Sequence, residues 1–309
     1  MNILCICMSP ALDATVTLKA WPKDGDVVKD VDEVENVGGK ALNVARWIAL
    51  RRRTPAARSV TVACGGLLGA DNAAPFEQEL ARFGIVDRFA RVPGATRRNE
   101  MVVTPAGSFK LNRRAFPALA AADFRFDVDG LAVGPGDVVV LSGSLPPCCP
   151  PTFYADCTRA FKARGATVVL DASGAPLRAA VLDAETCPDV IKPNAEECVP
   201  LVGFAPRTPE DFRHATATLH GRVPHVIISD GGSGCWFDGA FAPAPAVDVL
   251  DTTAAGDTLL AEWCWRTFAA PDADAARWAV AAGSAACTMP GGAPPPAELV
   301  EKLKGSVPK

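Results

Sequence analysis

Short runs of apolar residues recur along the chain, and most of them precede a segment with helical periodicity. Segments 41–52, 75–83 and 152–164 have the length and spacing of amphipathic helices. Strands that alternate with helices in this way predict an α/β protein with a Rossmann-like, doubly wound, mostly parallel sheet, which binds ligands at the carboxyl ends of its strands. The runs that we expect to form buried strands are 3–7, 60–64, 138–141, 167–170 and 226–229.

Two stretches do not follow this alternation. Residues 13–35 contain two β-like runs, and residues 99–111 have the pattern of a hairpin. Because neither stretch is followed by a crossover helix, we predict a small antiparallel β-lid beside the main sheet; the alternative is that these are edge strands of the core. The predicted division is a lid of residues 13–35 and 96–112 and a core of residues 1–12, 36–95 and 113–309.

Composition narrows the range of partners. The chain has 309 residues and a formal net charge of −4, so it has no basic excess of the kind that marks a nucleic-acid or membrane-surface protein. Its 11 cysteines are scattered through apolar stretches, which is typical of buried thiols rather than of a disulfide framework. We therefore expect a cytoplasmic protein that binds small molecules and neither nucleic acid nor membrane.

The segment around residue 255 carries the clearest chemistry. A loop of small and polar residues runs into an apolar stretch with helical spacing, so a helix should start near Ala255 or Gly256. The free N–H groups and the dipole of a helix start bind anions such as phosphate. Asp257 could accept the proton of a hydroxyl that attacks such a phosphate, although a carboxylate at this position could equally be a helix cap.

Four motifs, in order, resemble those of the PfkB (ribokinase-like) carbohydrate kinases. They are G-G-K-A-L-N-V-A at 38–45, K-P-N-A-E-E at 192–197, S-D-G-G-S-G at 229–234 and D-T-T-A-A-G-D-T at 251–258. The resemblance extends over essentially the whole chain. It implies a Rossmann-like core with a β-lid, ATP and Mg²⁺ as cofactors, and room for a monovalent cation.

The resemblance also implies roles on the ATP side. Asp257 would be the catalytic base, and the backbone of Ala254, Ala255 and Gly256 would form the anion hole. Asn194 and Glu197 would hold Mg²⁺ through water. The residues that would bind ATP are Lys192, Asn194, Ser229, Gly231 and Gly234. The glycines of this last group could instead form a plain turn before a strand.

On the acceptor side, the opening residues 9–13, the loop 141–147 and the run 96–99 resemble 1-phosphofructokinases and tagatose-6-phosphate kinases. Arg97 would pair with a phosphate that the acceptor already carries. The implied acceptor is fructose 1-phosphate or tagatose 6-phosphate; the alternatives are a kinase of an unphosphorylated sugar and a catalytically weak, regulatory sugar-phosphate-binding protein. Exposed lid strands would favour a homodimer. The acceptor residues implied are Asp13, Gly38, Gly39, Lys40, Asn43, Arg97, Asn99 and Ser144.

Four positions depart from the family pattern, because Ala41, Cys148, Ala254 and Glu262 stand where relatives carry glycine. An alanine at 254 would be strained by about 1 kcal/mol or more if its φ must be positive. Ala41 could crowd the sugar. An acidic residue at 262, inside an apolar helix, has no explanation at the level of the sequence.

Overall fold

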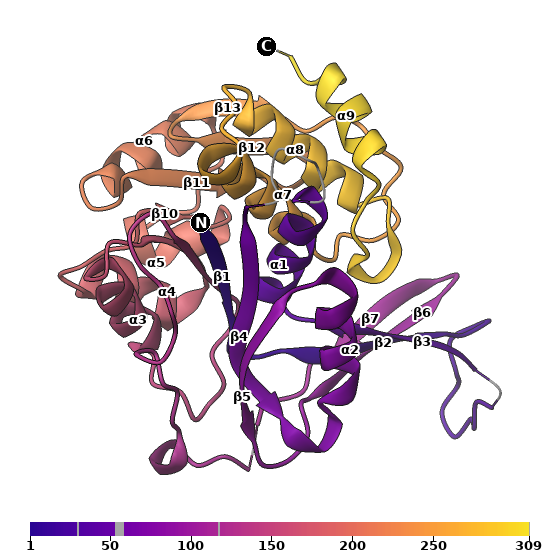
Figure 1. Cartoon of the computed structure of the whole chain (residues 1–309). Coiled ribbons are helices and arrows are strands. Elements are labelled where there is room, and N and C mark those ends of the chain that lie inside the picture. The colour runs from indigo at the N-terminus through magenta and orange to yellow at the C-terminus, as the bar shows by residue number, and fades with distance from the viewer. Residues whose placement is uncertain (30, 53–58, 117, 309) are drawn as a thin grey trace.

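The structure is a computed structural model that describes residues 1–29, 31–52, 59–116 and 118–308. Within these residues, nine strands form one sheet in the order β13-β12-β11-β10-β9-β8-β1-β4-β5 (Figure 1). Neighbouring strands from β11 to β5 are parallel, and β12 and β13 add an antiparallel edge. The strands are β1 Asn2–Cys7, β4 Thr61–Gly69, β5 Val86–Val92, β8 Val138–Ser142, β9 Thr167–Asp171, β10 Val190–Ile191, β11 His225–Ser229, β12 Gly234–Phe237 and β13 Ala240–Pro243.

Helices cover both faces of this sheet, which confirms the predicted doubly wound fold (Figure 1). Successive residues of β1 point to opposite faces: Ile3 and Cys5 pack into one apolar core, and Leu4 and Ile6 into the other. The first core is covered by α1 Lys40–Arg51, α2 Ala74–Phe83, α7 Ala255–Cys264, α8 Ala275–Ala286 and α9 Ala297–Ser306. The second is covered by α3 Phe153–Lys162, α4 Gly174–Arg178, α5 Val199–Val202 and α6 Pro209–His220.

A second, four-stranded sheet projects from the core (Figure 1). It consists of β2 Ala11–Thr17, β3 Asp32–Gly38, β6 Arg98–Thr104 and β7 Gly107–Leu111, in the order β3-β2-β6-β7. The alternative of edge strands in the core sheet is therefore wrong. The lid is also not antiparallel throughout, because its two hairpins are joined through a parallel β2–β6 pair that sets Asp13 beside Asn99.

Sequence periodicity missed several strands of the core sheet. β5, β10 and β13 were not predicted, and β3 begins only at Asp32, later than its β-like run at 27–34. β10 has two residues, too few for any period to be recognised. All eleven cysteines are free thiols and nine of them are buried, as expected for small apolar side chains. Within the described ranges, no helix has both the length and the apolar character needed to span a bilayer.

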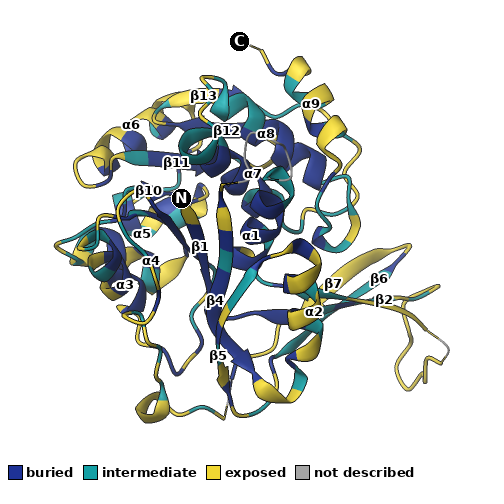
Figure 2. Ribbon diagram, in the orientation of Figure 1, coloured by how far each residue is buried: buried dark blue, intermediate teal, exposed yellow. Residues whose placement is uncertain are grey.

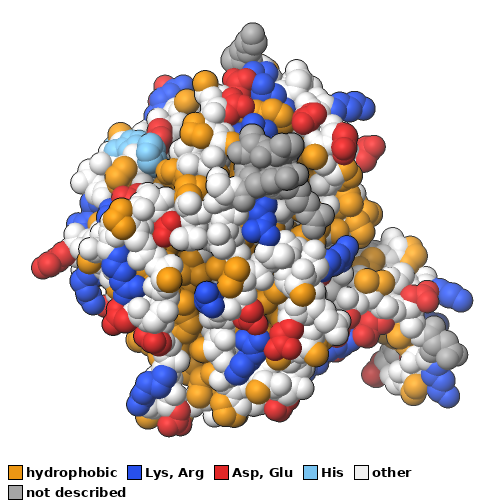
Figure 3. Space-filling model, in the orientation of Figure 1, with side chains coloured by type: hydrophobic (Ala, Val, Ile, Leu, Met, Phe, Trp, Pro, Cys, Tyr) orange, Lys and Arg blue, Asp and Glu red, His pale blue; other side chains and the backbone are white. Residues whose placement is uncertain are grey.

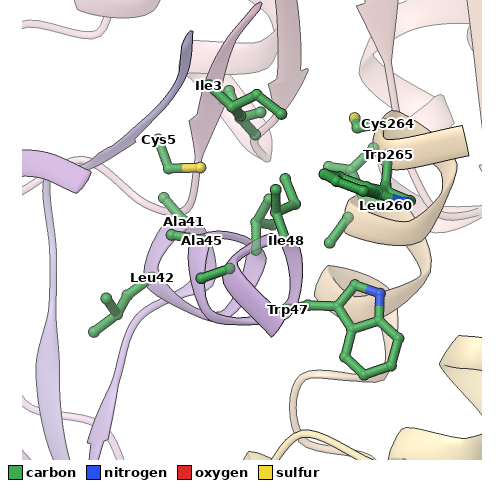
Figure 4. Packing of buried hydrophobic residues seen from close by; sticks show 14 of the residues in the cluster. Ile3, Cys5, Ala41, Leu42, Ala45, Trp47, Ile48, Leu260, Cys264 and Trp265 are labelled. Atoms are coloured by element: carbon green, nitrogen blue, oxygen red, sulfur yellow. The ribbon is translucent and has the colours of Figure 1, made fainter. Parts of the chain in front are cut away.

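The interface between α1 and α7 is central to the first core. Ala41 and Ala45 are fully buried, so α1 approaches β1 closely, while Ile48 of α1 packs towards Leu260 of α7 (Figure 4). Figure 2 shows that both helices are largely buried, whereas most residues of the lid sheet are intermediate or exposed. The apolar packing between α1 and α7 sets the positions of their first turns, which carry Asn43 and Asp257.

Candidate active site

A pocket of about 600 Å³ lies at the carboxyl ends of the core strands, next to the lid sheet. Ser144, Lys192 and Ser229 line it from the core, and Asp13 and Asn99 line it from the lid. The other predicted site residues that line it are Gly39, Lys40, Asn43, Arg97, Asn194, Glu197, Ala254, Gly256 and Asp257. The structure thus brings together residues more than 200 positions apart in the chain.

The start of α7 has the form expected of an anion site. The helix begins at Ala255, whose N–H donates to the carbonyl of Thr252 at 3.3 Å, and among the described residues no side chain caps the helix, so an anion could bind its next N–H groups. Asp257 lies inside the first turn and does not cap the helix. Ala254 precedes it in the left-handed conformation, with φ 62° and ψ 4°. An alanine is strained there by about 1 kcal/mol or more, a cost that glycine would avoid.

Asp257 is buried, with an exposed fraction of 6%. Its Oδ2 accepts a hydrogen bond of 2.7 Å from Nδ2 of Asn43. Burial and the nearby charge of Asp171 raise the pKa of Asp257 to about 6, although Lys40, the bond from Asn43 and Lys192 act in the opposite direction. A carboxyl group with such a pKa is ionised at neutral pH and still accepts a proton readily.

Asp171, which is fully buried, is the centre of a charge cluster that the sequence did not reveal; Lys192 is buried with it, whereas the side chain of Lys40 is exposed. Its Oδ1 lies 3.3 Å from Nζ of Lys192 and 3.5 Å from Nζ of Lys40, and Ser142 donates to its Oδ2. Burial disfavours the charged form of Asp171, but the two lysines outweigh it, so its pKa lies below the ordinary value. The cluster holds two cations beside the start of α7, where phosphates would add negative charge.

Asn194 and Glu197 form a tight turn at the pocket wall. The side-chain oxygen of Asn194 accepts from N–H of Glu197, and Oε2 of Glu197 accepts from N–H of Asn194, both at 2.9 Å. In the part of the chain that is described, no group of three or more His, Cys, Asp or Glu side chains could hold a metal. One carboxylate and one amide oxygen, completed by water and phosphate, are a donor set that fits Mg²⁺.

On the acceptor side, Asp13 of β2 accepts a hydrogen bond of 2.8 Å from Asn99 of β6. A Cβ atom at Gly38 would overlap the carboxylate of Asp13, and one at Gly39 would overlap Sγ of Cys7. Both glycines are therefore required by neighbouring protein groups, and Gly38 itself does not line the pocket. Ala41 also lies outside the pocket lining, so it does not crowd the acceptor space.

Two cationic side chains lie near the acceptor space. Arg97 donates from Nη1 to the carbonyl of Arg113 and from Nη2 to that of Ser9, and its buried Nε has no hydrogen-bond partner among the described residues. Lys110 of β7 was not predicted. Its Nζ donates to Oγ1 of Thr253 at 3.1 Å, which connects the lid to the loop before α7. A lone lysine on an exposed lid strand has no sequence signal that marks it as functional.

Three predicted residues besides Gly38 do not line the pocket: Ala255, Gly231 and Gly234. Gly234 has φ 141°, and a Cβ atom there would overlap the carbonyl of Ala242 on the neighbouring strand. Gly231 belongs to a short 3-10 turn before β12. The turn and the strand packing account for these glycines, and their contact with a nucleotide stays a prediction.

Near the carboxyl end of α7, three side chains compensate the charge of Glu262, which is fully buried. Its Oε2 accepts from Nε1 of Trp47 at 2.8 Å and lies 3.2 Å from Nε of Arg51, while its Oε1 accepts from Nε of Arg266 at 2.9 Å. The guanidinium of Arg266 also lies 3.9 Å from the ring centre of Trp278. Glu262 therefore ties α7 to α1 through a paired buried charge.

The fold and the pocket, with its uncapped helix start, paired lysines and buried carboxylate, are those of a phosphotransferase that acts on an alcohol group. The chain belongs to the pfkB family of carbohydrate kinases, because the model of that family, described as "pfkB family carbohydrate kinase", matches residues 8–298. This confirms the resemblance seen in the four motifs.

Relatives with assigned names agree with this membership. The chain is 33% identical to a 1-phosphofructokinase from Rhodobacter capsulatus over 84% of this chain and 82% of that protein. It is 34% identical to one from Haemophilus influenzae over 75% of each. Among solved structures, phosphofructokinase-2 from Escherichia coli in complex with potassium aligns with a TM-score of 0.84, 24% identity and 98% coverage of both chains. The structural likeness confirms the ribokinase-like fold.

Proposed function

We propose that this protein is an ATP-dependent kinase of a ketohexose phosphate, and that it converts fructose 1-phosphate to fructose 1,6-bisphosphate, with tagatose 6-phosphate as the second candidate acceptor. The observation that carries the proposal is the position of Asp257, whose buried carboxylate lies in one pocket with the paired lysines and with the Asp13–Asn99 pair. The relatives named 1-phosphofructokinase support the choice of acceptor.

In the proposed reaction, Asp257 takes the proton of the acceptor hydroxyl, whose oxygen attacks the γ-phosphorus of ATP. The new P–O bond forms while the bond to the β–γ bridging oxygen breaks, and ADP leaves with that electron pair. The N–H groups at residues 254–256 and the ammonium groups of Lys40 and Lys192 balance the charge that develops. Asn194 and Glu197 would hold Mg²⁺, which would neutralise charge on the phosphates, and Ser229, Gly231 and Gly234 would line the nucleotide groove.

For the phosphate that the acceptor already carries, we propose Arg97 and Lys110 as partners. Arg97 lines the pocket and, among the described residues, its guanidinium is bonded only to neutral backbone carbonyls, and Lys110 could exchange its bond to Thr253 for a phosphate oxygen. The Asp13–Asn99 pair would bind sugar hydroxyls, together with Ser144, which lines the same pocket. We also propose a monovalent cation as a cofactor, by analogy with the potassium complex of phosphofructokinase-2.

We further propose a homodimer through the lid and a cytoplasmic location. Trp21 stacks on Phe109 with ring centres 5.4 Å apart, and both residues are about 40% exposed. Val34 and Leu111 of the lid are 60% and 46% exposed. Such exposed apolar residues on a sheet favour a partner. The related phosphofructokinase-2 has a tetrameric form. A reducing cytoplasm suits eleven free thiols.

The distribution of charged side chains on the surface supports small-molecule partners. On the face shown in Figure 3, Lys and Arg side chains are mixed with Asp and Glu, and no large patch of a single sign is visible. The concentrated positive charge of Lys40 and Lys192 lies inside the pocket, where a phosphate could reach it.

The test is a panel of sugars and sugar phosphates with coupled detection of ADP. We expect the highest kcat/KM with fructose 1-phosphate. Turnover confined to unphosphorylated sugars would show that the acceptor is a sugar without a phosphate. If neither these sugars nor any phosphorylated ketose stimulates turnover, the protein would instead be a binding or regulatory protein. Arg97→Ala should mainly raise KM for the phosphorylated acceptor; an effect confined to ATP would contradict its assigned partner.

A further inference from the structure

A chain of polar side chains extends from Asp257 away from the pocket. Asn43 of α1 donates from Nδ2 to Oδ2 of Asp257 at 2.7 Å, and Oδ1 of Asn43 accepts from Nη2 of Arg46, one turn further along α1. Arg46 donates from Nη1 to Oε1 of Glu79 on α2 at 2.9 Å. Three helices therefore contribute to one connected set of hydrogen bonds.

The chemistry of arginine determines how the amide of Asn43 is oriented. A guanidinium group has only donors, so the atom of Asn43 that faces Arg46 must be the oxygen. The NH₂ group then faces Asp257, which as a carboxylate has only acceptors. Without Arg46, the amide could turn over whenever Asp257 is protonated, because its oxygen would then accept the proton of the carboxyl group.

Arg46 is well placed for this task because it is itself held in position. Its exposed fraction is only 6%, and a buried guanidinium needs a compensating charge. Glu79 supplies that charge, and its other oxygen lies 3.6 Å from Nη1 of Arg82, a side chain that is 75% exposed. Arg46 and Glu79 do not line the pocket, so they cannot act on the substrates directly.

We propose that Arg46, held by Glu79, is a positioning residue for catalysis: it fixes the amide of Asn43 so that its NH₂ group keeps the carboxylate of Asp257 ionised and directed towards the acceptor hydroxyl. This inference rests on the proposed function, in which Asp257 is the base. It adds a role for two residues outside the pocket, and it makes the acid–base behaviour of Asp257 depend on them.

The groups that face Asp257 are Asn43 from α1, the two lysines Lys40 and Lys192, and Asp171 from β9. Of these, only Asn43 contacts Arg46. If the amide turned over, its oxygen would face the carboxylate, and ionised Asp257 would be disfavoured. The loss of Arg46 should therefore shift the acid limb of the pH–rate profile to higher pH.

The experiment compares Arg46→Met with Arg82→Met in the full-length enzyme, using coupled ADP detection from pH 5 to pH 9. A hydrogen bond to a charged group is worth enough to predict a loss of about 10- to 100-fold in kcat/KM at neutral pH and an upward shift of the acid limb by about one pH unit. KM for ATP should change little. Arg82→Met, which removes a guanidinium that contacts the same glutamate but not Asn43, should leave the profile in place.

A double-mutant cycle separates positioning from a general structural role. If Arg46 acts through Asn43, Arg46→Met should lower kcat/KM by at most about two- to threefold in an Asn43→Ala background, where there is no amide to orient. Equal losses in both backgrounds, or an unshifted acid limb in Arg46→Met, would overturn the proposal. If Arg46→Met fails to fold, Glu79→Gln replaces it, with a shift in the same direction expected and no shift counting against the role.

Failure of the proposed function would look different. If Asp257→Asn kept near-normal turnover, Asp257 would not be the base, and the whole assignment would fall. If Asp257→Asn abolished turnover while Arg46→Met left the pH profile unchanged, only the positioning role would be lost.

Discussion

A carboxylate is buried near each end of α7, and the two carboxylates differ in how well neighbouring groups compensate their charge. Glu262 is surrounded by donors from Trp47, Arg51 and Arg266, so both of its oxygens are paired. Asp257, five residues earlier, receives one side-chain hydrogen bond among the described residues, from Asn43, and faces Asp171 as well as two lysines. The same helix thus carries one neutralised and one incompletely compensated charge.

This difference shows how burial can serve either stability or reactivity. A buried carboxylate with strong, matched partners holds elements together, because removal of one partner leaves an unpaired charge. A buried carboxylate with few partners gains proton affinity and becomes a base that can act near neutral pH. The position of the donors, rather than burial itself, separates Glu262 from Asp257.

The largest effect is expected for Asp257→Asn. Because the amide cannot accept the hydroxyl proton, kcat should fall by about 10²- to 10⁴-fold while KM for ATP changes little. The melting temperature should stay the same or rise, since a poorly compensated buried charge is removed. Coupled kinetics and a thermal melt measure both; a large drop in stability would mean that the two carboxylates do not differ as described.

Glu262→Ala should act mainly on stability. It removes the buried carboxylate that Arg51 and Arg266 share, although Arg266 keeps its ion pair with Asp272, and this should cost about 3–5 kcal/mol of unfolding free energy. Chemical denaturation monitored by circular dichroism measures this loss. Glu262→Gln is the matched control, because it keeps an acceptor for the Nε1–H of Trp47 and should cost less. A loss below about 1 kcal/mol for Glu262→Ala would remove the contrast with Asp257.

The pH dependence should follow Asp257. Its raised pKa of about 6 means that the carboxyl is protonated below this pH, where it can no longer take a proton from the acceptor. We expect kcat/KM to fall by about tenfold per pH unit below about pH 6 and to level off above it. A rate profile recorded between pH 4.5 and pH 8 tests this, with circular dichroism at each pH to show that the protein stays folded. An acid limb centred near pH 4 would indicate an unperturbed base.

The smallest effect concerns the residue before α7. Ala254→Gly should raise the unfolding free energy by about 1 kcal/mol, because glycine adopts its positive φ without strain. Ala255→Gly is the control one position later: it places glycine inside the helix, where it should cost about 0.5–1 kcal/mol. Thermal melts of both variants give the comparison. A destabilised Ala254→Gly would show that alanine is not strained in this loop.

Much of the fold could be predicted from local patterns. Apolar runs located β1, β8, β9 and β11, and helical spacing located α1, α2 and α3, because each has enough residues to show its period. The two-residue β10 and the parallel β2–β6 pair could not be predicted, since the first is too short and the second depends on how two hairpins meet.

The candidate site shows the same division. Asp257 and the small residues before it were recognisable as a loop that enters a helix. Asp171 and Lys110 were not, because each is an ordinary residue at the end of a strand or on a lid, and only its neighbours in space give it a role.

The sequence alone determined the fold class and the family, and it singled out Asp257 as the candidate base, because periodicity and motif spacing are local properties of the chain. The tertiary structure alone decided which carboxylate is neutralised, since Asp257 and Glu262 differ only through side chains brought in by other elements, chiefly α1. It also decided that Ala254 adopts a positive φ, which depends on how the loop meets α7. Charge compensation and backbone strain are set by neighbours in space, and a linear pattern contains neither.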